Sequence, residues 1–159
     1  MIRLIQSEIW KLKRYSVIWI GIATMLSVVL LTCFMEIGTP GTPTFSSFSD
    51  NVIWNNFSLI FPATIVLIAG YIIERERTDD TLKNLAAIPV SFRRLLVGKI
   101  IVCGMIAVFL AIVELLFTAI ISFILSYDGF TFFIMIKALL QMVGMNCFVF
   151  LAVLPIIIF

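Results

Sequence analysis

Long hydrophobic runs on both sides of a short, highly charged segment are the feature that most limits how this chain can fold. Residues 74–99 hold ten of the twenty charged residues in the 159-residue sequence. Each charge at the centre of a bilayer would cost about 2.5–3.5 kcal/mol, so ten would cost about 25–35 kcal/mol. The charged segment must therefore lie in water, while the flanking runs are long enough to cross a membrane.

Four runs in the sequence have the length and composition of membrane spans. Hydrophobic residues make up 62% of the chain and its mean hydropathy is +1.19, far outside the soluble range. We therefore predict an all-α, polytopic membrane helical bundle that forms a single transmembrane domain over residues 1–159. The expected spans are residues 15–35, 52–73, 100–127 and 138–159.

The N-terminal residues 1–14 have the pattern of an amphipathic helix. Apolar side chains recur at helical spacing, and basic residues occupy most of the remaining positions. Such a basic helix is typical of a segment that lies in the membrane interface. The alternative is a plain cytosolic extension of the first span.

The connections between the spans are expected to differ in character. Residues 36–51 are rich in Gly, Pro, Ser and Thr, which predicts a polar loop. Pro62 is expected to kink the second span. In the charged segment, Thr78 can cap a short helix that ends before Pro89. The sequence ends within a hydrophobic run, so we expect it to be incomplete at the C-terminus.

The placement of Lys and Arg predicts the orientation. Ten of these residues lie before the first span or in residues 74–99, whereas only Lys137 lies on the opposite side. Because basic residues are enriched in cytoplasmic loops, the N-terminus and the charged segment are expected to face the cytoplasm.

Glu114 is the only ionisable residue deep in a predicted span, which makes it a candidate functional residue. Small and polar residues share its helix face at Gly104, Ala107, Ala111, Thr118 and Ser122. One interpretation is a translocation path along Glu114, Thr118, Gln141 and Asn146, where the carboxyl group contacts substrate or carries protons. The other is a packing face, with Glu114 hydrogen-bonded to Gln141, Asn146 or Asn55.

Nothing in the sequence indicates an enzyme. There is no histidine, and Cys33, Cys103 and Cys147 are isolated in apolar runs, where they act as small hydrophobic residues. The segment that ends at Lys99 lacks the first glycine and the final Ser or Thr of a phosphate-binding loop. No catalytic residue, metal site or bound cofactor is expected. ATP, if it drives the protein, would be hydrolysed on another chain.

Residues 73–99 resemble the cytoplasmic loop of ABC-2 type exporter permeases. The matching positions are Glu74, Glu76, Thr81, Leu82, Leu85, Pro89, Val90, Ser91, Arg93, Leu96, Gly98 and Lys99. The basic N-terminus also resembles the connecting helix of this family. The wider sequence is most similar to the bacterial subgroup linked to self-protection against lantibiotics and bacitracin-type peptides.

This resemblance implies a permease subunit of the bacterial cytoplasmic membrane that exports a peptide antibiotic, a drug or a lipid-like substrate, with a role in antibiotic resistance. Its implied partners are a separate ABC ATPase subunit, a second permease copy or related permease, and the lipid bilayer, but no nucleic acid. The residues implied to contact the ATPase are Glu74, Glu76, Arg77, Thr81, Leu82, Leu85, Pro89, Ser91 and Arg93. The family has six spans, whereas this sequence shows four.

Two other functions fit the same residues. One is a proton-coupled small multidrug exporter that uses Glu114, and the other is a non-transporting membrane immunity or partner protein. Against the first, such exporters are shorter and have very short loops, whereas this chain devotes residues 74–99 to a charged element. Co-purification with a soluble ATPase separates the permease from both alternatives.

Overall fold

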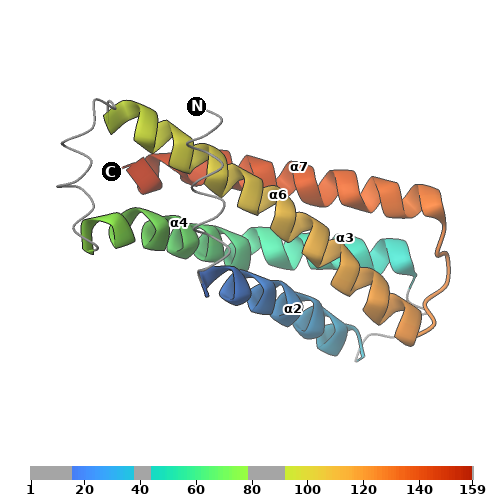
Figure 1. The fold of residues 1–159 in the computed structure, drawn as a ribbon. Helices are drawn as coiled ribbons and strands as arrows, with labels where there is room; N and C mark the ends of the chain where they lie inside the picture. The colour runs from blue at the N-terminus through green and yellow to red at the C-terminus, as the bar shows by residue number, and fades with distance from the viewer. Residues whose placement is uncertain (1–15, 38–43, 79–91, 159) are drawn as a thin grey trace.

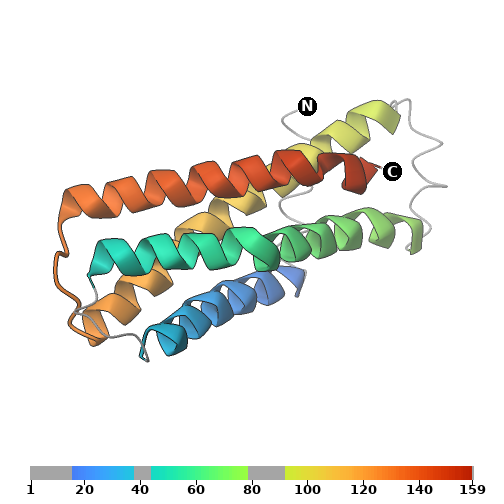
Figure 2. The ribbon, with the colours of Figure 1, turned by 180° about the vertical axis from the view of Figure 1, so that it is seen from behind.

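Four rods of helix form a bundle in the computed structural model, which describes residues 16–37, 44–78 and 92–158. The elements are α2 (Val17–Glu36), α3 (Phe45–Asn55), the π-helical turn η1 (Asn56–Ile60), α4 (Phe61–Thr78), α6 (Phe92–Ile124) and α7 (Phe132–Ile158). Because α3, η1 and α4 are continuous, they make one rod beside α2, α6 and α7 (Figures 1 and 2). The predicted all-α bundle is confirmed, while the predicted interfacial helix over residues 1–14 lies outside the described residues.

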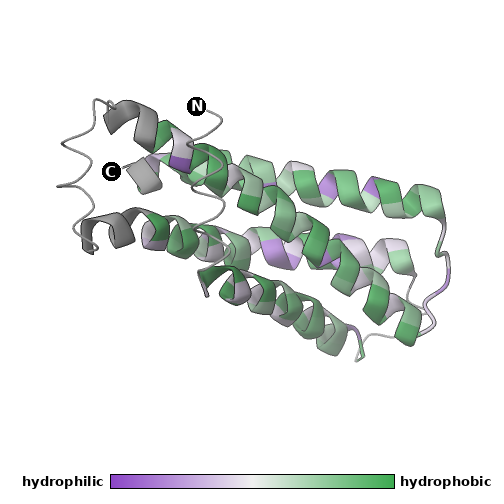
Figure 3. Ribbon diagram, in the orientation of Figure 1, coloured by the Kyte–Doolittle hydropathy of each residue, from purple (hydrophilic) through white to green (hydrophobic). Residues whose placement is uncertain are grey.

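Four helical segments are long and apolar enough to cross a membrane. They are Val17–Glu36, Phe45–Ile72, Leu96–Ile124 and Phe132–Ile156. Apolar residues run along all four rods, and polar positions stand out on α3, on α7 and near the start of α6 (Figure 3). This distribution is typical of helices that face both a protein core and lipid.

The second span begins earlier than the sequence indicated, because α3 starts at Phe45. Residues 45–51, which we predicted to be a loop, are therefore helical. Thr44 has an extended backbone and its Oγ1 accepts a hydrogen bond from the Ser47 backbone N–H at 3.3 Å, which caps the first turn. Phe45 and Phe48 are fully buried and anchor this turn to the bundle.

The third span ends earlier and the fourth begins earlier than predicted. Helix α6 ends at Ile124 and α7 begins at Phe132. Between them, Ser126 and Gly129 have positive φ angles of 53° and 81°, which reverse the chain within a few residues. The Phe45 backbone N–H donates to the Asp128 carbonyl oxygen at 3.0 Å and joins this turn to α3.

Aromatic and polar contacts close the end of the bundle near this turn. The rings of Phe48 and Tyr127 meet edge to face with centroids 5.3 Å apart, and those of Phe45 and Phe130 lie 4.8 Å apart. Glu36, at the end of α2, accepts a hydrogen bond from Asn51 Nδ2 at 2.8 Å. Burial raises the pKa of Tyr127, and the neighbouring Glu36 raises it further, so the phenol stays neutral.

The expected distortion at Pro62 takes the form of the π-helical turn η1. The Phe61 backbone N–H donates to the Asn56 carbonyl oxygen, five residues earlier, instead of four. Side-chain hydroxyls bond to backbone carbonyls on either side, with Ser58 Oγ donating to Trp54 and Thr64 Oγ1 to Ile60. A π-helical turn is one of the local adjustments that accommodate a proline in a membrane helix.

Helix α6 lies at the centre of the packing and contributes to both hydrophobic clusters of the core. One cluster joins it to α2, α4 and α7, and the other joins it to α2, α3 and α7. Helix α2 packs tightly at Gly21, where an added Cβ would lie 3.1 Å from a side-chain atom of Leu110 and 3.2 Å from one of Ile68. A side chain at this position would push α2 away from α4 and α6.

Candidate functional site

Three polar side chains from three different rods meet inside the bundle. Asn56 Nδ2 donates to Glu114 Oε2 at 2.8 Å, and Asn146 Nδ2 approaches the same oxygen at 3.5 Å. Asn56 Nδ2 also approaches Asn146 Oδ1 at 3.5 Å. All three side chains are buried, with exposed fractions of 1–2%. We call Asn56, Glu114 and Asn146 the amide–carboxyl cluster.

The cluster lies near the middle of the membrane-length segments. Glu114 is four residues from the midpoint of Leu96–Ile124, and Asn146 is two residues from the midpoint of Phe132–Ile156. Asn56 is the first residue of η1, also within three residues of the midpoint of its segment. A carboxyl group at this depth is costly unless it is enclosed by protein and hydrogen-bonded.

A column of small hydroxyl residues continues from Glu114 along α6. Thr118 and Ser122 follow at intervals of four residues, and both are buried. Thr118 Oγ1 donates to the Glu114 backbone carbonyl at 2.8 Å. The column points from the cluster toward the end of the bundle that holds the α6–α7 turn.

The structure brings together three of the four predicted path residues. Glu114, Thr118 and Asn146 lie in or beside the cluster, whereas Gln141 is exposed on the outside of α7. There it borders a groove of about 300 Å³ between α3 and α7, together with Asp50. Gln141 is therefore not the hydrogen-bond partner of Glu114 that the sequence suggested, because it points away from α6.

The predicted partner Asn55 was also wrong, and Asn56 takes its place. Asn55 Nδ2 donates to Thr32 Oγ1 of α2 at 2.9 Å instead. The two neighbouring asparagines thus join α3 to two different helices. Asn56 lies four residues after the buried Val52, so α3 carries it on the buried face, and the π-helical turn that follows brings Phe61 to that face as well.

The predicted ATPase-contacting residues are only partly described. Glu74, Glu76 and Arg77 lie on the last turns of α4, and Arg93 lies on the first turn of α6, so only residues 79–91 separate the two helices. Thr81, Leu82, Leu85, Pro89 and Ser91 lie outside the described residues.

Lys99 links the two ends of this segment, which sequence reasoning missed. Its side chain is buried at 3% exposure and its Nζ donates to the Ile72 backbone carbonyl at 2.9 Å. The contact joins α6 to α4 close to the point where both helices leave the apolar part of the bundle. The basic side chain of Lys99 next to Gly98 was the only sign of this contact in the sequence. Its partner, the Ile72 backbone carbonyl, is a group that no sequence pattern identifies.

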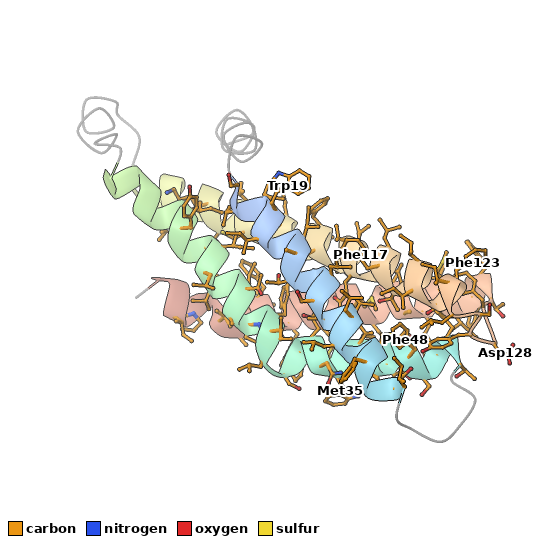
Figure 4. All side chains as sticks on the ribbon, turned by 90° about the horizontal axis from the view of Figure 1, so that it is seen from below. Trp19, Met35, Phe48, Phe117, Phe123 and Asp128 are labelled. Carbon is orange, nitrogen blue, oxygen red and sulfur yellow. The ribbon has the colours of Figure 1, made fainter. Side chains whose placement is uncertain are left out.

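In the side-chain view from below, side chains of neighbouring helices meet along the length of the bundle (Figure 4). Phe117 lies on α6 near the middle of the bundle, while Phe48 and Asp128 lie toward the end with the α6–α7 turn. In the part of the chain that the structure describes, no group of three His, Cys, Asp or Glu side chains could hold a metal ion. The arrangement is suited to holding helices together through polar contacts or to passing polar groups between them.

A bundle of four membrane-length helices with polar side chains enclosed at mid-depth defines a polytopic helical membrane protein. The chain belongs to the ABC-2 family of transporter proteins, whose sequence model matches residues 4–159. Proteins of this membrane family are transport components and not catalysts. No curated protein and no solved structure was found to match the chain.

Proposed function

We propose that the chain is the permease subunit of an ATP-driven ABC-2 exporter in the bacterial cytoplasmic membrane. The observation that carries this proposal is the family match over residues 4–159, together with four membrane-length helices. A separate ABC ATPase subunit would hydrolyse ATP, and a second permease copy or a related permease would complete the transporter. The N-terminus and the charged segment would face the cytoplasm, in line with the placement of the basic residues.

The charged segment is the proposed docking site for the ATPase. The Lys99–Ile72 contact keeps α4 and α6 together at the base of this segment. This contact ties the helix before residues 79–91 to the helix after them. A partner that pulls on the charged segment would therefore act on both helices, and this supports a role in coupling ATP hydrolysis to transport.

Docking can be tested with Leu82 and Leu85, which would share one face of the predicted helix over residues 78–88. Burial of each leucine in a partner groove contributes about 1.5–3 kcal/mol. The double change Leu82→Ser/Leu85→Ser should therefore weaken binding by about 3–6 kcal/mol, which is a factor of more than about 100. The measurement is recovery of the ATPase with the affinity-purified permease.

Residues on the other faces of the same predicted helix provide the matched control. Lys83→Ser/Asn84→Ser changes two neighbouring positions and should leave ATPase recovery within a few fold of wild type. Both double variants should reach the membrane at normal abundance, because all four positions lie in the charged segment outside the spans. Wild-type recovery of the ATPase by Leu82→Ser/Leu85→Ser would show that the leucines do not dock.

The proposed substrate is a peptide antibiotic of the lantibiotic or bacitracin type, which would make the chain part of an antibiotic-resistance system. This finer assignment rests only on the likeness of the sequence to that subgroup. The path would use Glu114, Thr118 and Asn146 inside the bundle and Gln141 on its surface. Expression with the ATPase should raise the peptide concentration that stops growth of a sensitive host, and unchanged sensitivity to such peptides would point to another substrate.

A second candidate function is proton-coupled export, which the burial of Glu114 at mid-depth favours. The two functions differ in their energy source. Membrane vesicles that contain the chain and its ATPase should accumulate substrate with ATP when the proton gradient is collapsed. Transport that needs the proton gradient and not ATP would favour the second function. If neither ATP nor the proton gradient drives transport and the host is still protected, the chain would be a non-transporting immunity protein.

A further inference from the structure

Two oxygen atoms in the amide–carboxyl cluster lack a hydrogen-bond donor. Glu114 Oε1 and Asn56 Oδ1 are both buried and neither has a partner among the described residues. By contrast, Glu114 Oε2 faces two amide donors, Asn56 Nδ2 at 2.8 Å and Asn146 Nδ2 at 3.5 Å. Buried polar atoms in native proteins are nearly always paired, so these two oxygens need an explanation.

The amide–carboxyl cluster has fewer hydrogen-bond donors than its acceptor atoms need. The amide of Asn56 has two hydrogens, and they point toward Glu114 Oε2 and Asn146 Oδ1. The two unpartnered atoms are both acceptors if Glu114 is a carboxylate. Another acceptor would not help either of them. The two atoms belong to side chains that the 2.8 Å hydrogen bond already joins. With the amide and the carboxyl group paired edge to edge, one additional hydrogen on Glu114 Oε1 would give Asn56 Oδ1 a donor.

A carboxylic acid supplies this hydrogen. In the acid, Oε2 would be the carbonyl oxygen, which is the better acceptor and is the oxygen that both amides approach. Oε1 would be the hydroxyl oxygen, with its hydrogen available to Asn56 Oδ1. Asn56 and Glu114 would then form a mutual pair, in which each side chain donates one hydrogen bond to the other and accepts one from it.

Among the described side chains, no positive charge lies close enough to pair with Glu114 if it were a carboxylate. The other charged residues with described side chains are Glu36, Asp50, Lys99, Asp128 and Lys137. Lys99 is 15 residues from Glu114 along α6, which is about 22 Å, and it bonds to Ile72. Glu36 bonds to Asn51, and Asp128 lies in the α6–α7 turn. Asp50 and Lys137 lie in the second turns of α3 and α7.

We propose that Glu114 and Asn56 form a proton-binding site at the centre of the bundle, with the proton on Glu114 Oε1 and shared with Asn56 Oδ1. Binding adds one proton from water to the carboxylate and changes its charge from −1 to 0, with no other bond formed or broken. The bound proton completes a link between the α3–η1–α4 rod and α6, with α7 attached through Asn146. The site does not depend on the proposed ATPase partner.

Infrared spectroscopy of the purified chain tests the proton directly. The protein is solubilised in an alkyl maltoside, which has no ester carbonyl, and wild type is compared with Glu114→Gln at neutral pH. The wild-type spectrum should contain the carbonyl stretch of one protonated carboxylic acid, shifted to lower frequency in D₂O and absent from Glu114→Gln. A difference spectrum with carboxylate bands instead would mean that a water molecule or a cation bridges the two oxygens, and would overturn the proposal.

Stability measurements provide a second and independent test. Glu114→Gln replaces the acid with an amide of the same shape that can make both bonds, so its thermal unfolding midpoint should match wild type. Glu114→Ala should lower the midpoint clearly. Thr118→Val is the matched control, because Thr118 is equally buried on the same face but bonds only to its own helix. An equal loss of stability in Glu114→Gln and Glu114→Ala would show that the site needs a charge and not a proton.

Discussion

Deletion of Leu59 would test whether the π-helical turn η1 sets the rotation of α3 relative to α4. Leu59 is 74% exposed, so its own side chain contributes little to the core. The turn holds one residue more than an α-helical turn, and each residue in an α-helix accounts for about 100° of rotation. A chain without Leu59 would close into a regular helix and rotate α3 by about 100° relative to α4.

This rotation would remove contacts whose cost can be worked out from the structure. With α4 in place, Asn56 would leave Glu114, and an unsatisfied buried polar group costs about 1–3 kcal/mol. Phe48, which is fully buried, would turn out of its cluster, and loss of a core phenylalanine costs about 3–5 kcal/mol. The sum of about 4–8 kcal/mol is a large part of the 5–15 kcal/mol that stabilises a typical domain.

The assay is size-exclusion chromatography of the fluorescently tagged protein in detergent after heating to a series of temperatures. The deletion should abolish the monodisperse peak or lower its midpoint strongly. Leu59→Ala keeps the residue count and should change stability by no more than about 0.5 kcal/mol. An alanine inserted after Phe57 in the deletion variant restores the count and should restore the peak. A wild-type midpoint for the deletion would refute the role assigned to η1.

Two further predictions concern topology and packing. A cysteine in place of the exposed Ser47 should react with a membrane-impermeant thiol reagent added to intact cells. A cysteine in place of Asn84 should not react. Labelling of both cysteines from outside would contradict the predicted orientation. Gly21→Leu should destabilise the bundle by about 1–3 kcal/mol because Leu110 and Ile68 already fill the space, whereas Gly70→Leu, with nothing within 4 Å, should be tolerated. Equal midpoints for the two variants in the same heating assay would show that α2 does not pack closely at Gly21.

The four membrane-length helices were predictable because hydropathy responds to the 30 Å apolar layer that each of them must cross. Hydropathy does not identify the part of a helix that extends beyond the apolar layer. For this reason residues 45–51 were predicted to be a loop, although they form the start of α3. The signal that could have corrected this is local. Thr44 is a good cap residue, and Phe45, Phe48 and Val52 follow it at helical spacing.

The amide–carboxyl cluster was predictable only in part. Glu114 stood out as the single carboxylate deep in a span, and Asn146 was one of its three candidate partners. Asn56 lies four residues after the buried Val52, so the spacing within α3 favoured it over Asn55, and η1 shifts the buried face only for the residues that follow. Phe48, Val52 and Asn56 line that face before the turn, whereas Phe61 and Ile65 line it afterwards. A regular α-helix cannot bury these two groups of residues against the same neighbouring helices. The change in spacing, from four residues to the five between Asn56 and Phe61, was the available sign that the turn holds one extra residue.

The unequal lengths of the helices have a consequence for the surrounding lipid. The apolar segment of α2 has 20 residues and is about 30 Å long, whereas that of α6 has 29 residues and is about 43 Å long. A tilt of about 40°, the upper end of the usual range, shortens the longer segment to about 33 Å, which still exceeds the thickness that α2 matches. Exposed Phe123 and Ile124 occupy the excess length at the end of α6. This difference in apolar length favours a thicker bilayer beside α6 than beside α2 and so a thickness gradient in the lipid that surrounds the protein.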